Sequence, residues 1–524
     1  MRTLERQAIR GSAARQHEHS LPAPAARPSL PPPPFLVAGL GRAGRAAISA
    51  LRRLVPPELL YCWDASTGEP VRGLALELRG AGIRTWLGAP PPLDGPLQSC
   101  AVVKSPGIPF SAPLIRRAQE LGMEVLDELE LGWRLSRVPV VAVTGTNGKS
   151  TVCALLSAIA RAGGLNAALA GNSQFAPPLS EVATADVDVI VCETSSFQLE
   201  GCSALLPEAA VLTNVRPEHM NRHGTFDAYA ACKRRLFVRG DRATPRVALN
   251  LDDDVGGQLF REVRERGVAA AGYGRAPAAE FRLRRLRWTL ASGWLEMETP
   301  DGAVALRSKL PGPHNAVNVA GAVAAARSLG FELETIVEAI ERTPGVPGRF
   351  ERIEEGQPFD VIVDFAHTPD AVSAVIATAR AIVRRRRGAR LHVLVSVAGH
   401  RTRELSAPIG QAVARFADRV VLTEGSSLGE PRGEVLAPLI EGARSVGGAG
   451  VEVVPDRRDA IRRVLAFGSS GDVVLVLGRG ALPRLFRHAN DAGVPFDDRE
   501  VVRATLRELC GRLGRKARGT RATR

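Results

Sequence analysis

The stretch VVAVTGTNGKSTV, residues 140–152, reads as an apolar strand that leads into a glycine loop and then a helix. A P-loop follows G-x-x-x-x-G-K-[ST], in which backbone N–H groups and the lysine hold phosphates. Gly148 and Lys149 fit the end of that pattern, but Val143 stands where its first glycine belongs, and Gly145 comes two residues later. The stretch therefore predicts a nucleotide site on an α/β sheet with a different type of phosphate loop.

Bulk composition is typical of a soluble protein that buries real cores. A chain of 524 residues, 45% hydrophobic and 24% charged, should form roughly three domains. No run approaches the ~18 apolar residues of a membrane helix, and the N-terminus lacks the apolar segment of a secretory signal. The seven cysteines are an odd number and include no C-x-x-C pair, which favours reduced thiols that pack in a core. We expect a cytoplasmic protein without membrane insertion.

The net charge of +14 is scattered along the chain rather than gathered in an aromatic-studded basic repeat. This pattern favours attraction to anionic small molecules and argues against nucleic acid. Of 69 basic residues only five are lysines, namely Lys104, Lys149, Lys233, Lys309 and Lys516. A lysine kept in an arginine-rich chain raises the question of whether an amine is needed there.

Before the glycine loop, residues 1–34 end in LPPPP and contain little that could form a core, so we expect a disordered extension. Then an apolar strand turns through Gly39-x-Gly41-x-x-Gly44, and a second strand ends at Asp64. This is a diphosphonucleotide fingerprint with its acidic partner. A dehydrogenase site and a purely structural tight turn are the alternative interpretations.

The middle of the chain alternates buried strands with helices, and each strand ends in polar residues. VDVIVCE ends at Glu193, and AAVLTN is followed by a loop with His219. Because carboxyl ends of parallel strands meet at one edge, these groups should lie near the phosphate loop, where Ser150 or Thr151 could hold Mg²⁺. Hairpin-like strands follow near 281–310, and a Pro/Gly hinge at 342–348 leads into a third α/β unit.

Six motifs together resemble the signatures of the Mur ligases, the ATP-dependent amide ligases of peptidoglycan precursor synthesis. They are GTNGKST, ETSSFQLE, NVRPEHMNRHGTFDAYAACKRRLF, LPGPHNAVNVAGA, GVPGRFE and VDFAHTPDA. GTNGK[ST] is that family's own phosphate loop, which accounts for Val143. The resemblance covers roughly residues 35–510. It implies a Rossmann-like UDP-binding domain (35–137), a central P-loop ATPase domain with a mostly parallel sheet (138–342), a Rossmann-like C-terminal amino-acid-binding domain (343–510) and a basic tail (511–524).

The resemblance also implies a mechanism, in which ATP phosphorylates the substrate carboxylate and an amine attacks the acyl phosphate. It assigns ATP binding to Gly145, Thr146, Asn147, Gly148, Lys149, Ser150, Thr151, His314, Asn315, Arg349 and Asp364. It assigns Mg²⁺ to Ser150, Glu193, His219 and Lys233, the last as a carbamate, and catalysis to Lys149, Glu193, His219 and Lys233. It assigns the UDP-linked substrate to Gly39, Gly41, Gly44, Asp64, Ser105, Asn172 and Ser195.

The sequence departs from the family in two places that bear on function. The family loop D-H-x-D-R-H is here Glu218-His219-Met220-Asn221-Arg222-His223, so the histidine remains while one carboxylate is longer and the other is an amide. The N-terminal half resembles the ligase that adds D-glutamate to UDP-MurNAc-L-alanine, and the C-terminal half resembles the ligase that adds the third residue. In that half, D-N-P-R is replaced by EGSSLGE (424–430), and G-K-G-H-E by GRGAL (478–482).

The lost acid of G-K-G-H-E would have met the distal ammonium of a diamino acid, whereas Arg479 and the arginines of AGHRTRE (398–404) suit a side-chain carboxylate. We therefore expect a monomeric enzyme that joins glutamate, as the D-enantiomer, to UDP-MurNAc-L-alanine. The alternatives are a third-residue ligase, a folylpolyglutamate-type ligase, a dehydrogenase and a non-catalytic Mur ligase paralogue.

Overall fold

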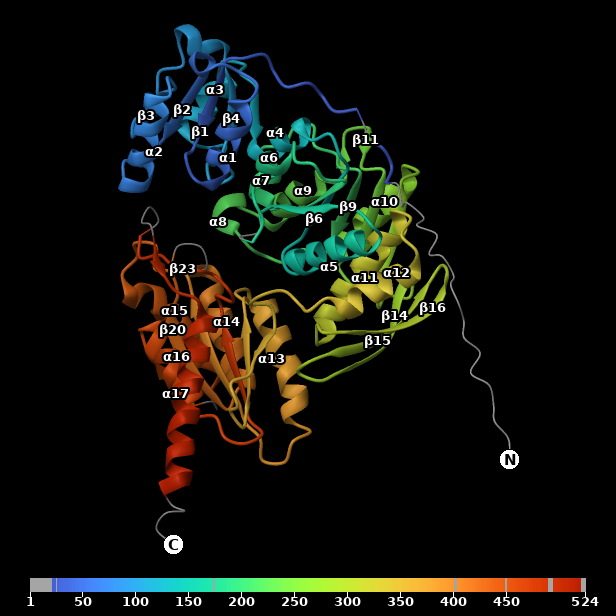
Figure 1. The fold of residues 1–524 in the computed structure, drawn as a ribbon, viewed down its shortest axis with the longest axis vertical. Helices are drawn as coiled ribbons and strands as arrows, with labels where there is room; N and C mark the ends of the chain where they lie inside the picture. The colour runs from blue at the N-terminus through green and yellow to red at the C-terminus, as the bar shows by residue number, and fades with distance from the viewer. Residues whose placement is uncertain are drawn as a thin grey trace, which may run out of the picture.

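Three β-sheets, each covered by helices, follow one another along the chain (Figure 1). The computed structural model describes residues 21–24, 26–172, 175–399, 403–447, 450–488 and 493–519. We call the three parts the N-terminal unit (blue in Figure 1), the central unit (teal to yellow) and the C-terminal unit (orange to red).

The N-terminal unit is a five-stranded parallel sheet in the order β3-β2-β1-β4-β5. Its central strand β1 and the adjacent strand β4 are buried along their whole length, as a parallel sheet with helices on both faces requires. Ligands of such sheets bind beyond the carboxyl ends of the strands. The strands are β1 (Phe35–Ala38), β2 (Leu60–Asp64), β3 (Arg84–Leu87), β4 (Ala101–Lys104) and β5 (Val125–Asp127). The helices are α1 (Arg42–Leu51), α2 (Glu69–Gly80), α3 (Pro113–Glu120) and α4 (Glu128–Leu135), with short 3-10 turns at Pro57–Leu59 and Gly95–Ser99.

The central unit has a nine-stranded sheet in the order β16-β15-β14-β13-β12-β9-β6-β8-β7. Seven neighbouring strands of this sheet, β14-β13-β12-β9-β6-β8-β7, run parallel. Strands β15 and β16 add an antiparallel meander next to β14, which confirms the hairpin-like strands predicted near 281–310. The strands are β6 (Val140–Thr144), β7 (Ala167–Gly171), β8 (Val189–Glu193), β9 (Ala209–Leu212), β12 (Arg246–Asn250), β13 (Ala269–Gly274), β14 (Phe281–Trp288), β15 (Gly293–Thr299) and β16 (Gly302–Ser308), with a small hairpin of β10 (Val238–Arg239) and β11 (Arg242–Ala243). The helices are α5 (Lys149–Ala162), α6 (Leu179–Val182), α7 (Ser196–Glu200), α8 (Met220–His223), α9 (Phe226–Arg234), α10 (Asp254–Glu265), α11 (Pro313–Ser328) and α12 (Leu333–Arg342).

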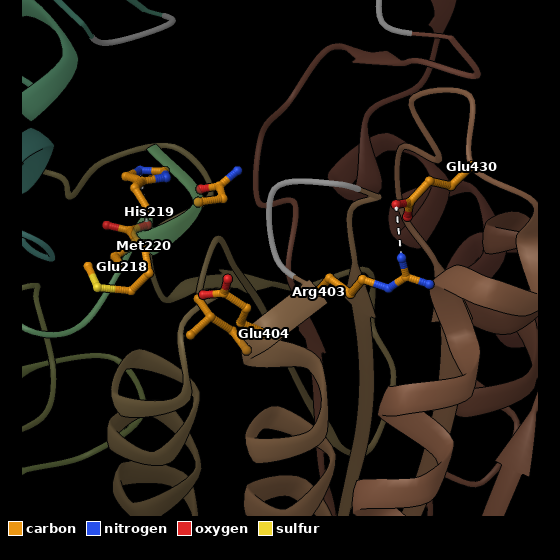
Figure 2. A pocket seen from close by; sticks show the side chains of 8 residues that line it. Glu218, His219, Met220, Arg403, Glu404 and Glu430 are labelled. Carbon is orange, nitrogen blue, oxygen red and sulfur yellow. Dashed lines mark ion pairs between the residues drawn. The ribbon is translucent and has the colours of Figure 1, made fainter. Parts of the chain in front are cut away.

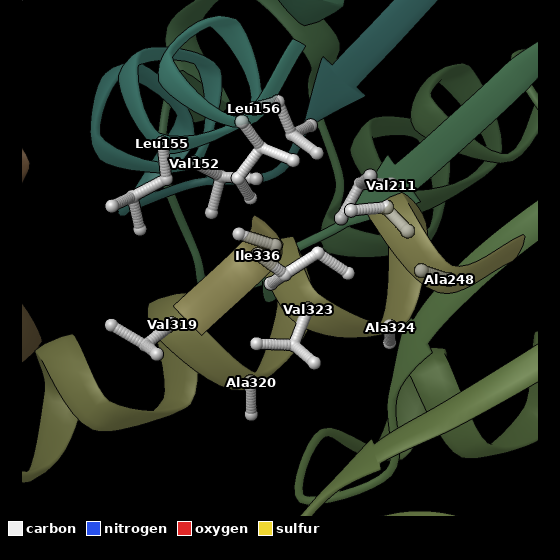
Figure 3. Close-up of a cluster of buried hydrophobic side chains, with 14 of the residues drawn as sticks. Val152, Leu155, Leu156, Val211, Ala248, Val319, Ala320, Val323, Ala324 and Ile336 are labelled. Atoms are coloured by element: carbon white, nitrogen blue, oxygen red, sulfur yellow. The ribbon is translucent and has the colours of Figure 1, made fainter. Parts of the chain in front are cut away.

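Helix α11 is the centre of the largest apolar cluster. It is rich in alanine and valine, and its residues are buried on nearly every face, as expected of a helix that is apolar all round. Figure 3 shows Val319 and Val323 of α11 next to Val152 and Leu156 of α5, with Ile336 of α12 close by. This packing fixes α5, and therefore the phosphate loop at its start, against the rest of the sheet.

The C-terminal unit has a six-stranded sheet in the order β17-β18-β22-β19-β20-β21, with only the edge strand β17 antiparallel. Its strands are β17 (Glu351–Ile353), β18 (Asp360–Asp364), β19 (Leu391–Val397), β20 (Arg419–Glu424), β21 (Gly450–Val453) and β22 (Val473–Leu477), and β23 (Arg484–Leu485) pairs with β24 (Val494–Pro495). The helices are α13 (Pro369–Val383), α14 (Arg403–Phe416), α15 (Arg432–Val446), α16 (Arg457–Leu465) and α17 (Asp498–Gly519).

The predicted fold class, three α/β units with mostly parallel sheets, is confirmed. All seven cysteines are free thiols, and six of them are buried. In the described part of the chain, no helix combines the length and the apolar character needed to cross a bilayer.

The expectation of disorder throughout residues 1–34 is wrong for the part next to β1. Arg27 donates to the carbonyl oxygens of Trp133 (2.9 Å), Ser136 and Val138 (2.9 Å), and forms an ion pair with Glu208 at 3.1 Å. Its side chain is 6% exposed, in the connection between α4 and β6. The sequence argument looked for apolar anchors and overlooked that carbonyls and a buried carboxylate can hold one arginine. Residues 1–20 lie outside the described residues.

Because Arg27 and Glu208 are both buried, removing the arginine leaves an uncompensated carboxylate. We expect Arg27→Ala to lower the free energy of unfolding by about 3 kcal/mol, seen as a lower urea midpoint by circular dichroism. The control is Arg117→Ala, which removes an exposed ion pair with Glu120 and should cost at most about 0.5 kcal/mol. Equal midpoints for the two variants would show that the arginine does not anchor the segment.

Candidate active site

The phosphate loop lies between β6 and α5, and its two glycines are required by their backbone conformation. Gly145 has φ +146°, and a Cβ there would lie 1.9 Å from Thr213 Oγ1; Gly148 has φ +87°, and a Cβ there would lie 2.2 Å from Asn318 Oδ1. Val143, at the position of the usual first glycine, is fully buried inside β6. The loop is therefore shorter than a standard P-loop because the strand continues to Thr144.

Lys149 and Ser150 begin α5 and face the loop. Lys149 Nζ donates to the carbonyl oxygens of Gly145 (3.1 Å) and Thr146 (2.8 Å). Ser150 Oγ donates to Glu193 Oε2 at 2.6 Å, and Glu193 ends the neighbouring strand β8. The structure thus brings a lysine, a hydroxyl and a carboxylate together at the carboxyl edge of the central sheet, as the sequence predicted.

Lys233 reaches the same loop from α9. Its side chain is fully buried, its Nζ donates to Gly145 O at 2.8 Å, and the ammonium lies 4.5 Å from the centre of the Tyr229 ring. Burial, reinforced by the positive charge of Lys149, lowers the pKa of Lys233 from 10.5 to about 7. At neutral pH a large share of this amine is therefore uncharged and nucleophilic.

The loop that contains Glu218 and His219 lies beside these lysines. His219 adopts a left-handed conformation (φ +60°) at the start of α8, and burial lowers its pKa to about 4. Burial opposes ionisation of Glu218, but the hydrogen bond and charge of His367 (3.2 Å) outweigh it and hold the pKa of Glu218 below its usual range. His219 is thus a neutral imidazole at physiological pH, which is the form that binds a metal.

The predicted metal residues suit Mg²⁺ only if other oxygen ligands join them. Within the described ranges, no group of three or more His, Cys, Asp or Glu side chains could hold a metal ion alone. Ser150 and Glu193 supply the oxygen ligands that Mg²⁺ prefers, and this ion usually keeps waters or substrate phosphates as further ligands. His219 and the amine of Lys233 supply nitrogen, so their fit depends on the carbamate.

A cleft between the central and C-terminal units contains the residues predicted to bind the nucleotide base and ribose. It is lined by Gly148, Thr151, His314, Asn315, Arg349 and Asp364, together with Asn318 and His367. Asn315 is oriented by its donation to Pro311 O (2.9 Å) and by acceptance from Asn318 (3.2 Å). Burial lowers the pKa of His314 to about 4, and its Nδ1 is buried without a hydrogen-bond partner. An unpaired ring nitrogen here suits a polar ligand in the cleft.

The hinge brings both sides of this cleft into contact. Arg349 donates to Ser150 Oγ at 3.3 Å and stacks over the Phe365 ring at 4.5 Å. Asn147 of the phosphate loop donates to Thr368 Oγ1 at 3.3 Å. Asp364 accepts from two backbone amides of the C-terminal unit, and burial raises its pKa. Residues from the two sides of the hinge thus lie next to each other in this structure.

In the N-terminal unit the glycine fingerprint forms a tight strand–helix turn. A Cβ on Gly44 would lie 1.7 Å from Gly39 O, whereas Gly41 has open space around it. Asp64 accepts from the backbone N–H groups of Leu40 (2.6 Å) and Ser66 (2.7 Å), and Ser105 Oγ donates to Gly39 O at 3.1 Å. Gly41 is therefore the position where a diphosphate could approach the backbone.

Two predicted substrate residues are held by groups of the central unit. Asn172 Nδ2 lies 3.5 Å from Glu193 Oε1, at the edge of the metal residues. Ser195 caps α7 in a reciprocal arrangement with Gln198, which occupies its hydroxyl. The structural role of Ser195 is thus visible, and its contact with substrate stays a prediction.

A second pocket opens between the 218–221 loop and the C-terminal unit (Figure 2). Arg403 lies in it 4.0 Å from Glu430 and donates to Glu434 at 3.3 Å. Glu404 is on the side of the pocket nearer Glu218 and Met220. The pocket therefore offers one guanidinium and several carboxylates to an incoming amino acid.

Arg479 does not reach this pocket, and its predicted role as a carboxylate ligand is wrong. Its side chain is 3% exposed, lies 3.7 Å from Asp498 and donates to the carbonyl oxygen of Arg484 at 2.8 Å. Burial lowers the pKa of Arg479 to about 10. The arginine holds the β23–β24 region against α17. The prediction failed because the sequence pattern could not show that an acid from α17 lies next to Arg479.

His367 is a site residue that the sequence analysis did not select. It belongs to VDFAHTPDA, a motif used there only for the resemblance, and it crosses from the C-terminal unit to Glu218. The only sequence signal was its place just after the carboxyl end of β18, where functional groups of parallel sheets gather.

Three α/β units with a phosphate loop in the central one define a nucleotide-binding protein, and comparison with known proteins shows its family. Residues 143–326 match the Mur ligase middle domain, and residues 348–480 match the Mur ligase glutamate ligase domain. A UDP-N-acetylmuramoyl-L-alanyl-D-glutamate–2,6-diaminopimelate ligase of Geobacillus thermodenitrificans is 31% identical over 74% of this chain and 82% of the relative. A UDP-N-acetylmuramoylalanine–D-glutamate ligase of Pelotomaculum thermopropionicum is 32% identical over 89% of this chain and 96% of the relative.

Solved structures agree at the level of the fold. The UDP-N-acetylmuramate-alanine ligase of Thermotoga maritima is 20% identical, covers 92% of this chain and all of its own, and has a TM-score of 0.57. MurF from Acinetobacter baumannii is 17% identical, covers 86% of this chain and 91% of its own, and has the same TM-score. The chain belongs to the Mur ligase family. Its members are ATP-dependent ligases that form amide bonds.

The buried amine of Lys233 should make stability depend on pH. Its folded-state pKa lies below the unfolded value of 10.5, so the unfolded chain binds the extra proton between about pH 7 and 10.5 and stability rises with pH there. Lys233→Met removes the free-energy cost of burying this amine. We expect it to raise the free energy of unfolding by about 2–4 kcal/mol at pH 6, with a much smaller gain near pH 10.

The measurement is thermal denaturation at both pH values in buffer freed of CO₂. Lys309→Met, at an exposed position outside the phosphate loop, is the control and should show no such pH-dependent gain. An equal gain in the free energy of unfolding at pH 6 and pH 10 would mean that the pKa of Lys233 is not lowered in the folded protein.

Proposed function

We propose that this chain joins glutamate, as the D-enantiomer, to UDP-N-acetylmuramoyl-L-alanine, with ATP as the energy source. The observation that carries the proposal is the length over which this chain aligns with relatives of each kind, the D-glutamate ligase and the diaminopimelate ligase. The D-glutamate ligase relative aligns over 477 residues and 89% of this chain, whereas the diaminopimelate ligase relative aligns over 414 residues and 74%. The wider alignment favours a substrate handled as in the D-glutamate ligase.

The amino-acid pocket supports an acidic amine donor through Arg403. Its guanidinium is more than half exposed and is shared by Glu430 and Glu434, so it can turn one face to a side-chain carboxylate of a substrate. Arg479, now assigned to a structural role, no longer contributes to this argument. The support therefore rests on one arginine and on the alignment.

The proposed chemistry follows the arrangement at the phosphate loop. Lys149 and the backbone N–H groups of residues 145–150 neutralise the phosphates of ATP, and Arg349 approaches them from the C-terminal unit. The carboxylate of the alanyl substrate attacks the γ-phosphate, the bond to the β-phosphate breaks, and an acyl phosphate and ADP are formed. The amine of glutamate then displaces phosphate and forms the amide bond. Asn315 and His314 would contact the adenine, and Asp364 the ribose.

Mg²⁺ would be held by Ser150 and Glu193 and, at a second position, by His219 and Lys233. When bound, it withdraws charge from the phosphate oxygens. The amine of Lys233 would add CO₂ and lose a proton to become a carbamate, which would supply the anionic oxygen that the second position lacks. Its pKa of about 7 supports this step because the uncharged amine is the reactive form.

Gly39, Gly41, Gly44, Asp64 and Ser105 would hold the UDP group, and Asn172 and Ser195 the muramoyl part. We place the reaction in the cytoplasm, where ATP and UDP-linked sugars are available, and we expect a monomer. Light scattering that gave the mass of two chains would contradict the monomer.

A third-residue ligase is the second candidate. Several close relatives, including a UDP-N-acetylmuramyl-tripeptide synthetase of Roseiflexus that is 33% identical, carry that kind of name. Glu404 and Glu430 in the pocket would also suit the distal ammonium of a diamino acid. The two candidates differ in both substrates, so one assay separates them.

The decisive assay is amino-acid-dependent phosphate release with ATP and Mg²⁺. UDP-MurNAc-L-alanine and its glutamyl dipeptide are each combined with D-glutamate, L-glutamate, lysine and diaminopimelate. We expect turnover of the alanyl substrate with D-glutamate. Turnover of the dipeptide with a diamino acid would select the third-residue ligase, and no turnover in any combination would select a non-catalytic paralogue.

Lys233→Ala should lower kcat by about 10³-fold, because the proposed carbamate ligand and its charge are lost. Short carboxylates such as acetate or propionate, added at high concentration, should restore part of the activity by filling the ligand position. Lys309→Ala serves as the control and should behave as the wild type with and without the acids. Full activity of Lys233→Ala without added carboxylate would remove the carbamate from the mechanism.

A further inference from the structure

Arg222 connects the central unit to the N-terminal unit through backbone carbonyls. Its guanidinium donates to the carbonyl oxygens of Pro106 (3.4 Å), Gly107 (3.3 Å) and Ile108 (3.1 Å). These three residues follow β4 of the N-terminal sheet, whereas Arg222 lies in α8 of the central unit, close to the blue unit in Figure 1. One side chain therefore spans the boundary between the two units.

The other face of the guanidinium is fixed inside the central unit. Glu200, at the end of α7, accepts from Arg222 at 2.5 and 3.0 Å, and the Phe197 ring lies 4.9 Å below the guanidinium. The arginine side chain is 12% exposed. A shielded, two-pronged ion pair of this kind is stiffer and stronger than a pair on the open surface.

The loop that Arg222 contacts supports the glycine fingerprint directly. Ser105 Oγ donates to Gly39 O at 3.1 Å, and Ile108 N donates to Ser105 O at 3.0 Å. A Cβ on Gly39 would lie 3.1 Å from Ile108 Cδ1, so the side chain of Ile108 is packed against the glycine turn. Movement of the 106–108 loop would therefore move the turn that is proposed to hold UDP.

The backbone of Arg222 is bonded to the loop that contains Glu218 and His219. The backbone N–H of Arg222 donates to His219 O at 2.9 Å, within the single turn of α8. A continuous path thus runs from Gly39 through the 106–108 loop and Arg222 to His219, and every step in it is a hydrogen bond or a packing contact.

We propose that Arg222 is a positioning residue that sets the spacing between the UDP-binding turn and the site where the substrate carboxylate reacts. The proposal rests on the proposed function, in which the substrate is held at both ends. A ligand with two anchors binds well only if both can be engaged at once, and a small misplacement of one anchor is felt as lost affinity and rate. A substrate without the UDP group has no second anchor, so its binding does not depend on that spacing.

The two units keep other connections when Arg222 is changed. Asp127 N donates to Gly201 O at 3.0 Å, and Ser203 Oγ donates to Glu130 at 3.0 Å. We therefore expect Arg222→Ala to loosen the 106–108 loop without unfolding either unit. Arg222→Lys keeps the charge but not the fork that serves Glu200 and the carbonyls together, so it should recover only part of the effect.

The test compares two substrates in wild type, Arg222→Ala and Arg222→Lys. One is UDP-MurNAc-L-alanine, and the other is MurNAc-L-alanine, which lacks the whole UDP group. For Arg222→Ala we expect the KM of the UDP-linked substrate to rise about tenfold or more, and that of the short substrate to stay within about twofold. An equal rise for both substrates would overturn the proposal, since a general structural defect acts on both.

Arg327→Ala is the matched control. Arg327 also forms a two-pronged pair, with Asp301 at 2.7 and 2.9 Å, and also donates to a backbone carbonyl, but all its partners lie in the central unit. The Arg327→Ala variant should be less stable than the wild type, and the ratio of its KM values for the two substrates should be unchanged. The same change of ratio in this control would also overturn the proposal.

Amide hydrogen exchange in the absence of substrate separates this proposal from the proposed function. Exchange in residues 105–112 should rise in Arg222→Ala and not in Arg327→Ala; unchanged exchange would overturn the link itself. If the wild type turns over none of the amino acids, the proposed function has failed. In that case the affinity for UDP-MurNAc-L-alanine, measured by calorimetry, tests the role of Arg222. A weaker affinity in Arg222→Ala alone supports the spacing role. Equal affinity in all variants, or no binding in any, rejects it.

Discussion

The carbonyl oxygen of Gly145 is the contact on which the candidate active site depends. It accepts from Lys149 at the start of α5 and from Lys233 at the end of α9, so two buried or half-buried amines converge on one backbone oxygen. This is possible only because Gly145 adopts a conformation in which a side chain would strike Thr213. The closeness of the two cations lowers the pKa of Lys233 further than burial alone. A requirement of the backbone thus becomes a chemical property of a side chain 88 residues away.

Arginines hold the three units in their relative positions. Arg27 fastens the segment before β1 to the connection between α4 and β6, Arg222 joins α8 to the 106–108 loop, and Arg349 reaches Ser150 across the hinge. Arg27 and Arg222 each serve several acceptors at once, which the planar fork of five donors allows and a lysine does not. The large arginine excess therefore has a structural use at unit boundaries, where carbonyl oxygens would otherwise lack donors. It also explains why a basic chain need not have a basic binding surface.

Much of the fold could be predicted because its signals are local. Strand ends, glycine turns and the antiparallel meander follow from residues that are neighbours in sequence, and the structure has them where they were expected. The predictions that failed required knowledge of distant partners. Arg27 looked like part of a disordered extension because its acceptors lie more than 100 residues away, and Arg479 looked free because Asp498 was not known to be adjacent. His367 went unselected for the same reason, since Glu218 comes from another unit.

The sequence by itself determined the class of protein and the inventory of its site: a glycine loop without the usual first glycine, a lysine retained among arginines, and polar residues at successive strand ends. These are properties of short segments, and backbone geometry makes them readable. Only the tertiary structure decided which of those residues meet and in what state. Burial sets the pKa of Lys233 and of His219. Contacts between segments that are distant in sequence commit Arg479 to Asp498 inside the C-terminal unit, and Arg222 to the 106–108 loop of the N-terminal unit. Such effects depend on what surrounds a group in space, because desolvation and charge act through distance and not through position along the chain.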